Sequence, residues 1–448
     1  MSALGGGGGA FGDKGLKMPL AETLRLAWAD DELRPKILFV IFVFAVFALG
    51  VNIPVPIPGV TSEEIYDKLK TLPMFQFLDV FGGGALRRIS ILALGLNPYI
   101  TSSIIMQILT TAFPQWKKEL QEGGEYARRQ QNRRTRMLTL VLCVFQAWGL
   151  LKLMGNAINI TAFDTVVVII FWTAGAMFML WLGEQISERG IGNGVSLMIF
   201  AGIMISMPTQ GASIYKALTD NMIQWYQVAL LIIIFLAVTW FIVLFTTAQR
   251  RIPIQHMRRM QGTRAVGGQT SYLPLTLNMA GVIPIIFAIS LVFMPQQFAG
   301  MFPPTSTPHE VLMTIQSYIS PGLRSLEGLI GCFVFAFLIF FFTYFYTAVQ
   351  YNVEDISNNL KRGGSFVPGV RPGKQTKDFL DDVISRITIV GATFLALIAL
   401  LQFLAPDITG IQNVGYFFGT SLLIMVSVAL ETMRQIEANL LMKQYGGA

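Results

Sequence analysis

Long apolar stretches follow one another along almost the whole chain, separated by short polar segments. A helix needs about 20 mostly apolar residues to cross a bilayer. Ten stretches approach that length, at residues 37–53, 96–113, 136–151, 165–183, 195–207, 225–248, 272–294, 328–351, 387–405 and 415–430. The pattern predicts an all-α polytopic membrane protein with ten transmembrane helices. Residues 195–207 are short for a full crossing, and 272–294 contain Pro274 and Pro284.

Composition supports this class of protein. The 448 residues are 53% hydrophobic and 13% charged, with a mean hydropathy of +0.57. Soluble globular proteins carry about 25% charged residues, so this chain cannot cover a water-facing surface. The high apolar content also excludes an intrinsically disordered chain. With only two cysteines, Cys143 and Cys332, each inside an apolar stretch, a disulfide scaffold is excluded too.

The distribution of basic residues predicts the orientation. Lys and Arg concentrate in short cytoplasmic loops, and 26 of the 33 basic residues are internal if the amino terminus is cytoplasmic. Ten crossings then put both termini in the cytoplasm. The stretch before the first span shows no cleavable signal peptide. The predicted parts are a cytoplasmic segment 1–36, a first half 37–207, an external hinge loop 208–225, a second half 226–434 with cytoplasmic loops 249–270 and 351–386, and a cytoplasmic tail 435–448.

Each half contains five spans, an odd number, so the second half must enter the membrane in the opposite orientation. This arrangement permits an inverted repeat with a functional site between the halves. It is an inference from topology alone, because the two halves show no obvious similarity in sequence.

One stretch between the first two long spans is unusual. Residues 89–116 are uncharged yet rich in Asn, Ser, Thr and Gln, a content typical of helices that line a cavity or pack on other helices. Before it, residues 85–94 are compatible with a helix too short to cross a bilayer. Arg87 and Arg88 are costly in hydrocarbon, so we expect a short helix folded into an external, water-filled mouth. An ordinary external loop is the alternative.

Three cytoplasmic loops are large and basic, at residues 114–136, 250–269 and 354–386. Glycine and proline punctuate the third, which predicts a tip of defined shape. Such a loop can dock an acidic or nucleic-acid partner. The alternative is that its cations only set the orientation of the chain, and this alternative is weakest for Arg371, inside its turn.

The chain resembles the SecY family, the channel subunits of the protein-conducting translocase. The resemblance runs from the first span to Leu430 and is carried by four groups of residues. They are Gly83-Gly84-Ala85-Leu86 with Gly95-Leu96-Asn97-Pro98-Tyr99-Ile100; the run from Gly183-Glu184-Gln185 to Gly192-Asn193-Gly194; Leu273-Pro274-Leu275 with the run from Asn278 to Pro284; and Phe366-Val367-Pro368-Gly369-Val370-Arg371-Pro372-Gly373.

The resemblance implies an hourglass channel with a lateral gate between the second and seventh spans, and it implies roles for particular residues. It makes 82–94 the plug, including Gly83, Gly84, Ala85, Leu86, Arg87, Arg88 and Ile89. It puts Leu96, Ile100, Ile199, Ile286 and Ile424 in a hydrophobic pore ring, with Ile283 as a weaker candidate. It makes Gln107 and Asn278 polar residues of the gate. It gives contact with a ribosome or the SecA motor to Arg250, Arg251, Arg258, Arg259 and Arg371.

The implied function is passage of unfolded polypeptides across, and release of hydrophobic segments into, a bacterial cytoplasmic membrane. The implied partners are SecE and SecG subunits, the SecA motor, the ribosome, signal peptides, unfolded polypeptides and membrane lipid, with no DNA. We expect no cofactor.

Two other classes of function compete. A secondary transporter with inverted repeats shares the topology, but it usually needs ionisable groups inside the membrane, and these are nearly absent from the spans. An intramembrane enzyme needs a nucleophile or a metal site, whereas the two histidines, His256 and His309, fall in loops on opposite sides. We therefore expect neither catalytic nor metal-binding residues. Simple packing in the core is the alternative role for each aliphatic residue of the ring.

Overall fold

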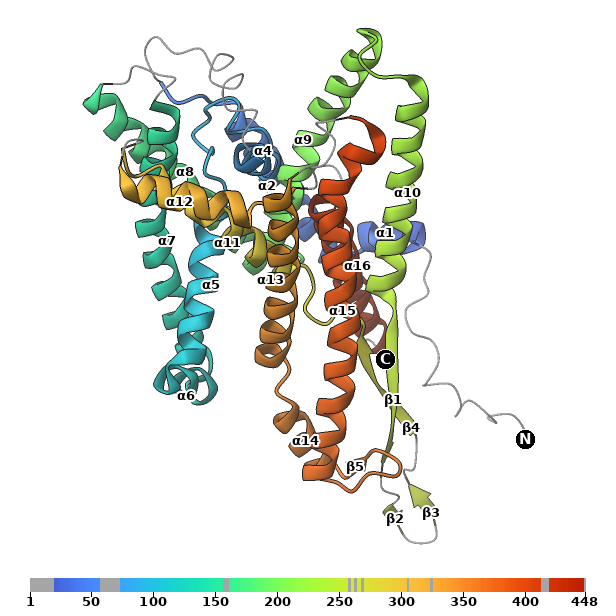
Figure 1. Cartoon of the computed structure of the whole chain (residues 1–448). Helices are drawn as coiled ribbons and strands as arrows, with labels where there is room; N and C mark the ends of the chain where they lie inside the picture. The colour runs from blue at the N-terminus through green and yellow to red at the C-terminus, as the bar shows by residue number, and fades with distance from the viewer. Residues whose placement is uncertain are drawn as a thin grey trace.

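Helices make up nearly all of the regular structure in the computed structural model (Figure 1). The structure describes residues 20–56, 73–155, 161–256, 259–261, 264–266, 270–303, 306–322, 325–411 and 419–446. A helix covers most or all of nine of the ten predicted stretches, and a tenth helix covers only the second part of 272–294. These helices are α2 (Leu33–Val51), α5 (Asn97–Ala112), α7 (Gly124–Gly155), α8 (Ala162–Arg189), α9 (Gly194–Thr219), α10 (Trp225–Thr247), α11 (Ile283–Ala299), α13 (Leu326–Gln350), α15 (Lys374–Thr409) and α16 (Thr420–Gly446).

The helical class is confirmed, whereas the number of crossings stays a prediction. Within the described residues, seven helices are long and apolar enough to cross a membrane, judged by length and composition alone. The other three on the predicted stretches are α5, α11 and α16. Of these, α5 has 16 residues and α11 has 17, so both are short for a full crossing.

The predicted span at 272–294 is wrong in its first part. Strand β4 (Thr270–Thr276) pairs antiparallel with β1 (Gln249–His256), and α11 begins only at Ile283. Pro274 lies in β4, an edge strand that can accommodate a residue without a backbone N–H. Pro284 lies in the first turn of α11, where an N–H has no helical partner anyway. The two prolines therefore flank the change from strand to helix.

The predicted hinge loop at 208–225 is mostly helix. Helix α9 continues through Pro208 to Thr219, and only residues 220–224 link it to α10. A proline inside a helix removes one backbone hydrogen bond. On either side of it, the hydroxyls of Ser206 and Thr209 donate to backbone carbonyls three residues earlier in the chain, at 2.8 and 2.7 Å. Likewise, residues 435–446 of the predicted tail continue α16.

Several shorter elements lie between the long helices. The helices are α1 (Leu20–Ala29), α4 (Pro73–Phe81), α6 (Pro114–Glu122), α12 (Thr307–Ile319) and α14 (Val353–Arg362), and the strands are β2 (Arg259–Gln261), β3 (Arg264–Val266) and β5 (Ser365–Phe366). One sheet has the order β4-β1-β5, and β2 pairs with β3. In Figure 1, α6, α14, β5, β2 and β3 gather at the lower end of the molecule. The three basic loops therefore share one end.

Two clusters of buried side chains matter for function. The larger one joins α2, α8, α9, α11, α13, α15 and α16, and Trp172, Phe47 and Phe335 are almost completely buried in it. A second cluster at the loop end packs Ile252 of β1 and Val367, beside β5, against Leu380 of α15. This second cluster fixes the β-sheet to the base of a long helix, so the loops that it carries are held in place.

The amino-terminal helix α1 is clamped to the end of α16. Lys443 Nζ lies 2.9 Å from Asp30 Oδ1 and 2.8 Å from Glu32 Oε2. Beneath these ion pairs, Ala27 packs with Ile436 and other apolar side chains. The hydrogen bond from Lys443 lowers the pKa of Asp30 from 3.8 to about 2. The contact joins residues from opposite ends of the sequence.

The clamp generates a prediction about α1. In Lys443→Glu a third carboxylate faces Asp30 and Glu32, and we expect faster hydrogen exchange of the α1 amides, while Lys443→Arg preserves their protection. Because the pKa of Asp30 is lowered in the folded protein, its contribution to docking is fully present above pH 3.8 and is lost as the pH falls through about 2. Equal exchange in Lys443→Glu and the parent protein contradicts the clamp.

Candidate pore ring and plug

A small enclosed cavity brings together four of the six residues expected in the pore ring. Leu96, Ile100, Ile199 and Ile286 all line it, from the start of α5, from α9 and from α11. Its volume is about 20 Å³, enough for about one water molecule. The remaining lining residues are Leu78, Phe81, Gly82, Leu94, Gly95, Asn97, Met179, Met198 and Ser290. The cavity is therefore mainly apolar and nearly filled by side chains.

The other two expected ring residues lie elsewhere. Ile283 is one helical turn before Ile286 on α11 and packs, partly buried, against the large core cluster. Ile424 on α16 is buried in the same cluster, with 1% of its surface exposed. Neither is among the residues that line the cavity. Both are placed as residues of the apolar core.

The segment expected to be a short helix, 85–94, is instead a series of turns. Positive φ angles occur at Gly83 (71°), Gly84 (82°), Ile89 (49°) and Gly95 (56°). A right-handed helix needs negative φ, and side chains other than glycine rarely adopt positive values. The positive φ of Ile89 is incompatible with a continuous helix through the segment, and the glycines with positive φ lie at both of its ends. Propensity within residues 85–94 alone did not reveal this.

The same segment is buried, contrary to the expected position in a water-filled mouth. Ala85 and Leu86 have 0% of their surface exposed, and Ile89 has 5%. All three belong to the large core cluster. Most apolar side chains of the segment therefore fill the space between helices, and only Arg87, Arg88 and Ile91 are partly exposed.

Hydrogen bonds satisfy much of the backbone of this buried, non-helical segment. Val55 N donates to Ile89 O at 2.9 Å, and Ile91 N donates to Ile53 O at 3.0 Å. The Ser90 hydroxyl donates to Gly50 O on α2 at 2.8 Å. Non-helical backbone at membrane depth is tolerated only where protein or water supplies such partners. The chain directly after α2 supplies them here.

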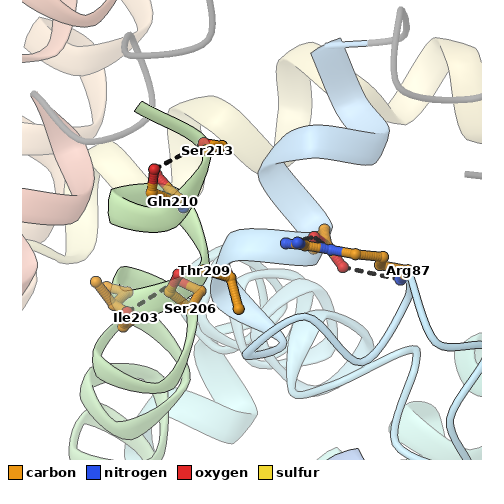
Figure 2. Close-up of polar contacts among 7 residues, drawn as sticks. Arg87, Ile203, Ser206, Thr209, Gln210 and Ser213 are labelled. Carbon is orange, nitrogen blue, oxygen red and sulfur yellow. Dashed lines mark hydrogen bonds and ion pairs between the residues drawn. The ribbon is translucent and has the colours of Figure 1, made fainter. Parts of the chain in front are cut away.

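The two arginines of the segment have specific partners. Arg87 reaches back to Asp79 on α4, with Nη2 at 2.8 Å and Nε at 3.2 Å from Asp79 Oδ2, and its backbone N–H donates to Oδ1 at 2.8 Å. The Asp79 side chain is only 5% exposed. Arg88 donates to Asn52 Oδ1 at the end of α2. Figure 2 shows Arg87 beside α4, with Ser206, Thr209 and Gln210 on the neighbouring α9.

The expected gate residues are not joined to each other. Gln107 lies on α5 and borders an open groove with Thr110, Arg128 and Asp355. Asn278 lies in the loop between β4 and α11 and is 9% exposed. Gln107 Oε1 and both polar atoms of the Asn278 side chain lack a hydrogen-bond partner among the described residues. No Gln107–Asn278 hydrogen bond is therefore formed in this structure.

The basic loop residues lie at the surface where the structure describes them. Arg250 and Arg251 are exposed on β1, and Arg371 is exposed after a tight turn. In that turn Val370 N donates to Val367 O at 3.0 Å, and Gly369 has φ +83°. This is the pattern of a type II turn with Pro368 and Gly369 as its two central residues. The tip thus has the defined shape that its glycines and prolines predict. Arg259 lies in β2, and Arg258 lies outside the described residues.

Sequence reasoning missed several residues of this region. Asp79 and helix α4 were not singled out, nor were Phe81, Met179 and Met198, which line the cavity. One signal was available for Asp79: a lone carboxylate in an apolar stretch, eight residues before an arginine. The methionines carried no such signal, because their contacts depend on how α8 and α9 cross.

Comparisons with known sequences agree with one another. The sequence pattern of the SecY family matches residues 90–433. The chain is 37% identical over 440 residues to the protein translocase subunit SecY of Staphylococcus epidermidis, covering 95% of this chain and 99% of the relative. It is 38% identical over 443 residues to the subunit of the same name from Halalkalibacterium halodurans, covering 95% and 99%.

Solved structures share the fold at much lower identity. A SecY structure concerned with how the plug domain stabilises the closed channel has a TM-score of 0.67 at 19% identity, covering 91% of this chain and 92% of that one. Sec61 from a canine ribosome–channel complex has a TM-score of 0.62 at 18% identity, covering 91% and 93%. The family pattern, the near full-length relatives and the shared fold together place this chain in the SecY family.

Proposed function

We propose that this chain is a protein-conducting channel that passes unfolded polypeptides across a membrane and releases hydrophobic segments sideways into lipid. One observation carries the proposal: a mainly aliphatic cavity at the meeting point of α5, α9 and α11 is closed by a buried segment without helical structure. The names of the relatives, protein translocase subunits, support the same function.

The aliphatic lining explains how such a channel stays sealed without selecting its substrate. Leu96, Ile100, Ile199 and Ile286 offer no side-chain hydrogen-bonding groups to water or ions. A narrow hydrophobic constriction dewets and so blocks ions. The same side chains accept any passing sequence, because they demand no particular partner. Sealing and indifference to sequence thus come from one chemical property.

Residues 82–94 then act as the plug in the resting channel. Gly82 and Leu94 line the cavity, and the residues between them fill the space beside it. A translocating chain needs this space, so the segment must move away during transport. Because it is a set of turns with its own hydrogen bonds, it can be displaced without unfolding a transmembrane helix.

Lateral release requires separation of α5 from α11, which are in contact at rest. No Gln107–Asn278 hydrogen bond holds them together, so the closed gate depends on apolar packing. The open groove beside Gln107 has a volume of about 760 Å³ and is lined by residues of α5, α6, α7, α13 and α14. A hydrophobic signal segment can compete for apolar contacts and leave into lipid, a better solvent for it than water.

The family supplies the expected partners and orientation. We propose a bacterial cytoplasmic membrane, with both termini in the cytoplasm and two inverted halves of five helices each. SecE and SecG are the proposed companion subunits. Arg250, Arg251 and Arg371, exposed at the loop end, are proposed to contact the SecA motor or the ribosome. Arg258 and Arg259 belong to the same proposed surface.

The topology alone would also fit a secondary transporter, but the buried ionisable residues that such a protein needs are nearly absent from the described part of the chain. Among the residues that the structure describes, Asp79 is the one charged residue that is buried, and it forms an ion pair with Arg87. Ion-coupled transport needs ionisable groups that exchange partners along the pathway. Import of a signal-bearing polypeptide into vesicles, against uptake of small solutes, separates the two functions.

A substitution in the ring tests the seal. Ile286→Asn places an amide in the cavity lining, which favours wetting, so we expect higher resting ion conductance and less dependence on a functional signal sequence. Ile289→Asn is the matched control, because Ile289 is buried on the same helix outside the cavity lining. It should reduce the amount of folded protein without raising conductance per channel. Parent-level conductance in Ile286→Asn would argue against the ring.

A second set of variants tests the loop tip. If Arg371 contacts an acidic motor surface or ribosomal phosphate through its guanidinium fork, Arg371→Glu should abolish polypeptide import and Arg371→Lys should impair it. Lys361→Glu, another exposed cation between α13 and α15, should have less effect. Import is measured at equal protein level and equal membrane insertion. Equal import by Arg371→Glu and the parent protein would leave Arg371 only a role in orientation.

A further inference from the structure

Both ends of the plug segment pack their backbone directly against helical glycines. At Gly202 on α9, an added Cβ atom would lie 2.1 Å from the carbonyl oxygen of Phe81. At Gly175 on α8, it would lie 1.9 Å from the carbonyl oxygen of Ile91. Non-bonded carbon and oxygen atoms do not approach so closely, so no residue other than glycine fits either position as the backbone now stands. We call these two positions the glycine sockets.

The sockets differ from other helical glycines because the backbone they meet belongs to the ends of the plug segment; Gly194, for example, meets the carbonyl oxygen of Gly183 instead. At Gly50 on α2 the nearest atom is the end of the Leu92 side chain, which can rotate away. At Gly211, further along α9, no atom lies within 4 Å of an added Cβ. The contact at each socket is with backbone, which can move only if the plug segment moves. Helix α9 therefore carries two restrictive glycines, Gly194 and Gly202, and an unrestricted one, Gly211.

The loop between the sockets is tied to α4, the helix directly before it. Asp79 accepts three hydrogen bonds from Arg87, and Gly84 N donates to Asp79 O at 2.7 Å. Breaking this pair would leave the Asp79 carboxylate, which is only 5% exposed, without its charged partner, so the connection is expensive to break. We therefore expect the loop and the end of α4 to move together when the carbonyls leave the sockets.

We propose that Gly175 and Gly202 are positioning residues of the seal: the channel is closed only while the Ile91 and Phe81 carbonyls occupy the two sockets, and opening empties them. The inference rests on the proposed channel function and deepens it. The reason is the geometry of the cavity, because Gly82 and Leu94, which close it, are one and three residues from the carbonyls held in the sockets. A shift of about 1 Å at a socket moves these lining residues too.

The first experiment substitutes the sockets. Gly175→Ala and Gly202→Ala, reconstituted with the companion subunits, should each raise resting ion conductance several-fold while signal-dependent import continues. Gly211→Ala is the matched control on α9, and its conductance should equal that of the parent protein. Parent-level conductance in both socket variants overturns the proposal. Equal leak in Gly211→Ala overturns it as well, because the effect would then be general to helical glycines.

The second experiment does not depend on the folding of the alanine variants. A Cβ atom at Gly83 would lie 3.5 Å from Ile205 Cβ, within the range for a disulfide. In a background of Cys143→Ala and Cys332→Ala, the pair Gly83→Cys with Ile205→Cys should form a disulfide that holds the loop beside its socket on α9. We expect import to stop in the oxidised protein and to return on reduction, with each single cysteine variant as a control.

The two kinds of failure are distinguishable. If the parent protein imports no signal-bearing polypeptide, the proposed function fails. If the parent imports polypeptide and the oxidised double-cysteine protein imports it equally well, the channel function stands and the sockets are not emptied on opening.

Discussion

A stretch of chain without helix, buried among membrane helices, must find a hydrogen-bond partner for its own backbone. Residues 82–96 meet this constraint by pairing with the chain after α2, through Val55 and Ile53, and by turning on themselves. Without those bonds, unsatisfied peptide groups at membrane depth would cost several kcal/mol each. The position of the plug segment, and with it the shape of the aliphatic cavity, depends on this network.

The network also explains why a seal can be both tight and movable. Apolar side chains such as Leu86 exclude water, while the polar groups bond locally, to α2, to the chain after it and to Asp79 on α4. Part of the packing against α8 and α9 occurs at Gly175 and Gly202, where backbone meets backbone. Such a contact is close but carries little directional bonding, so a competing chain can replace it.

The sequence predicts the long helices well, because apolar stretches of sufficient length have few alternatives in a membrane. The sequence fails to predict the structure where local geometry decides. Residues 272–276 belong to a stretch that is apolar enough for a span, yet pairing with β1 makes them a strand. Residues 85–94 have helix-compatible side chains, yet positive φ at Gly83, Gly84 and Ile89 forces turns. Four of the six residues expected in the ring line one cavity, and their role in a pore stays a prediction. The Asp79–Arg87 pair needed the three-dimensional fold.

The central claim is that residues 82–94 close an aliphatic pore at rest and leave it during transport. Leu94 and Ile286 line the same cavity, so the most direct measurement is disulfide formation between Leu94→Cys and Ile286→Cys in protein that lacks Cys143 and Cys332. The account predicts efficient crosslinking in resting channels and its loss when a polypeptide is trapped in transit. Equal crosslinking with and without the trapped chain would contradict it.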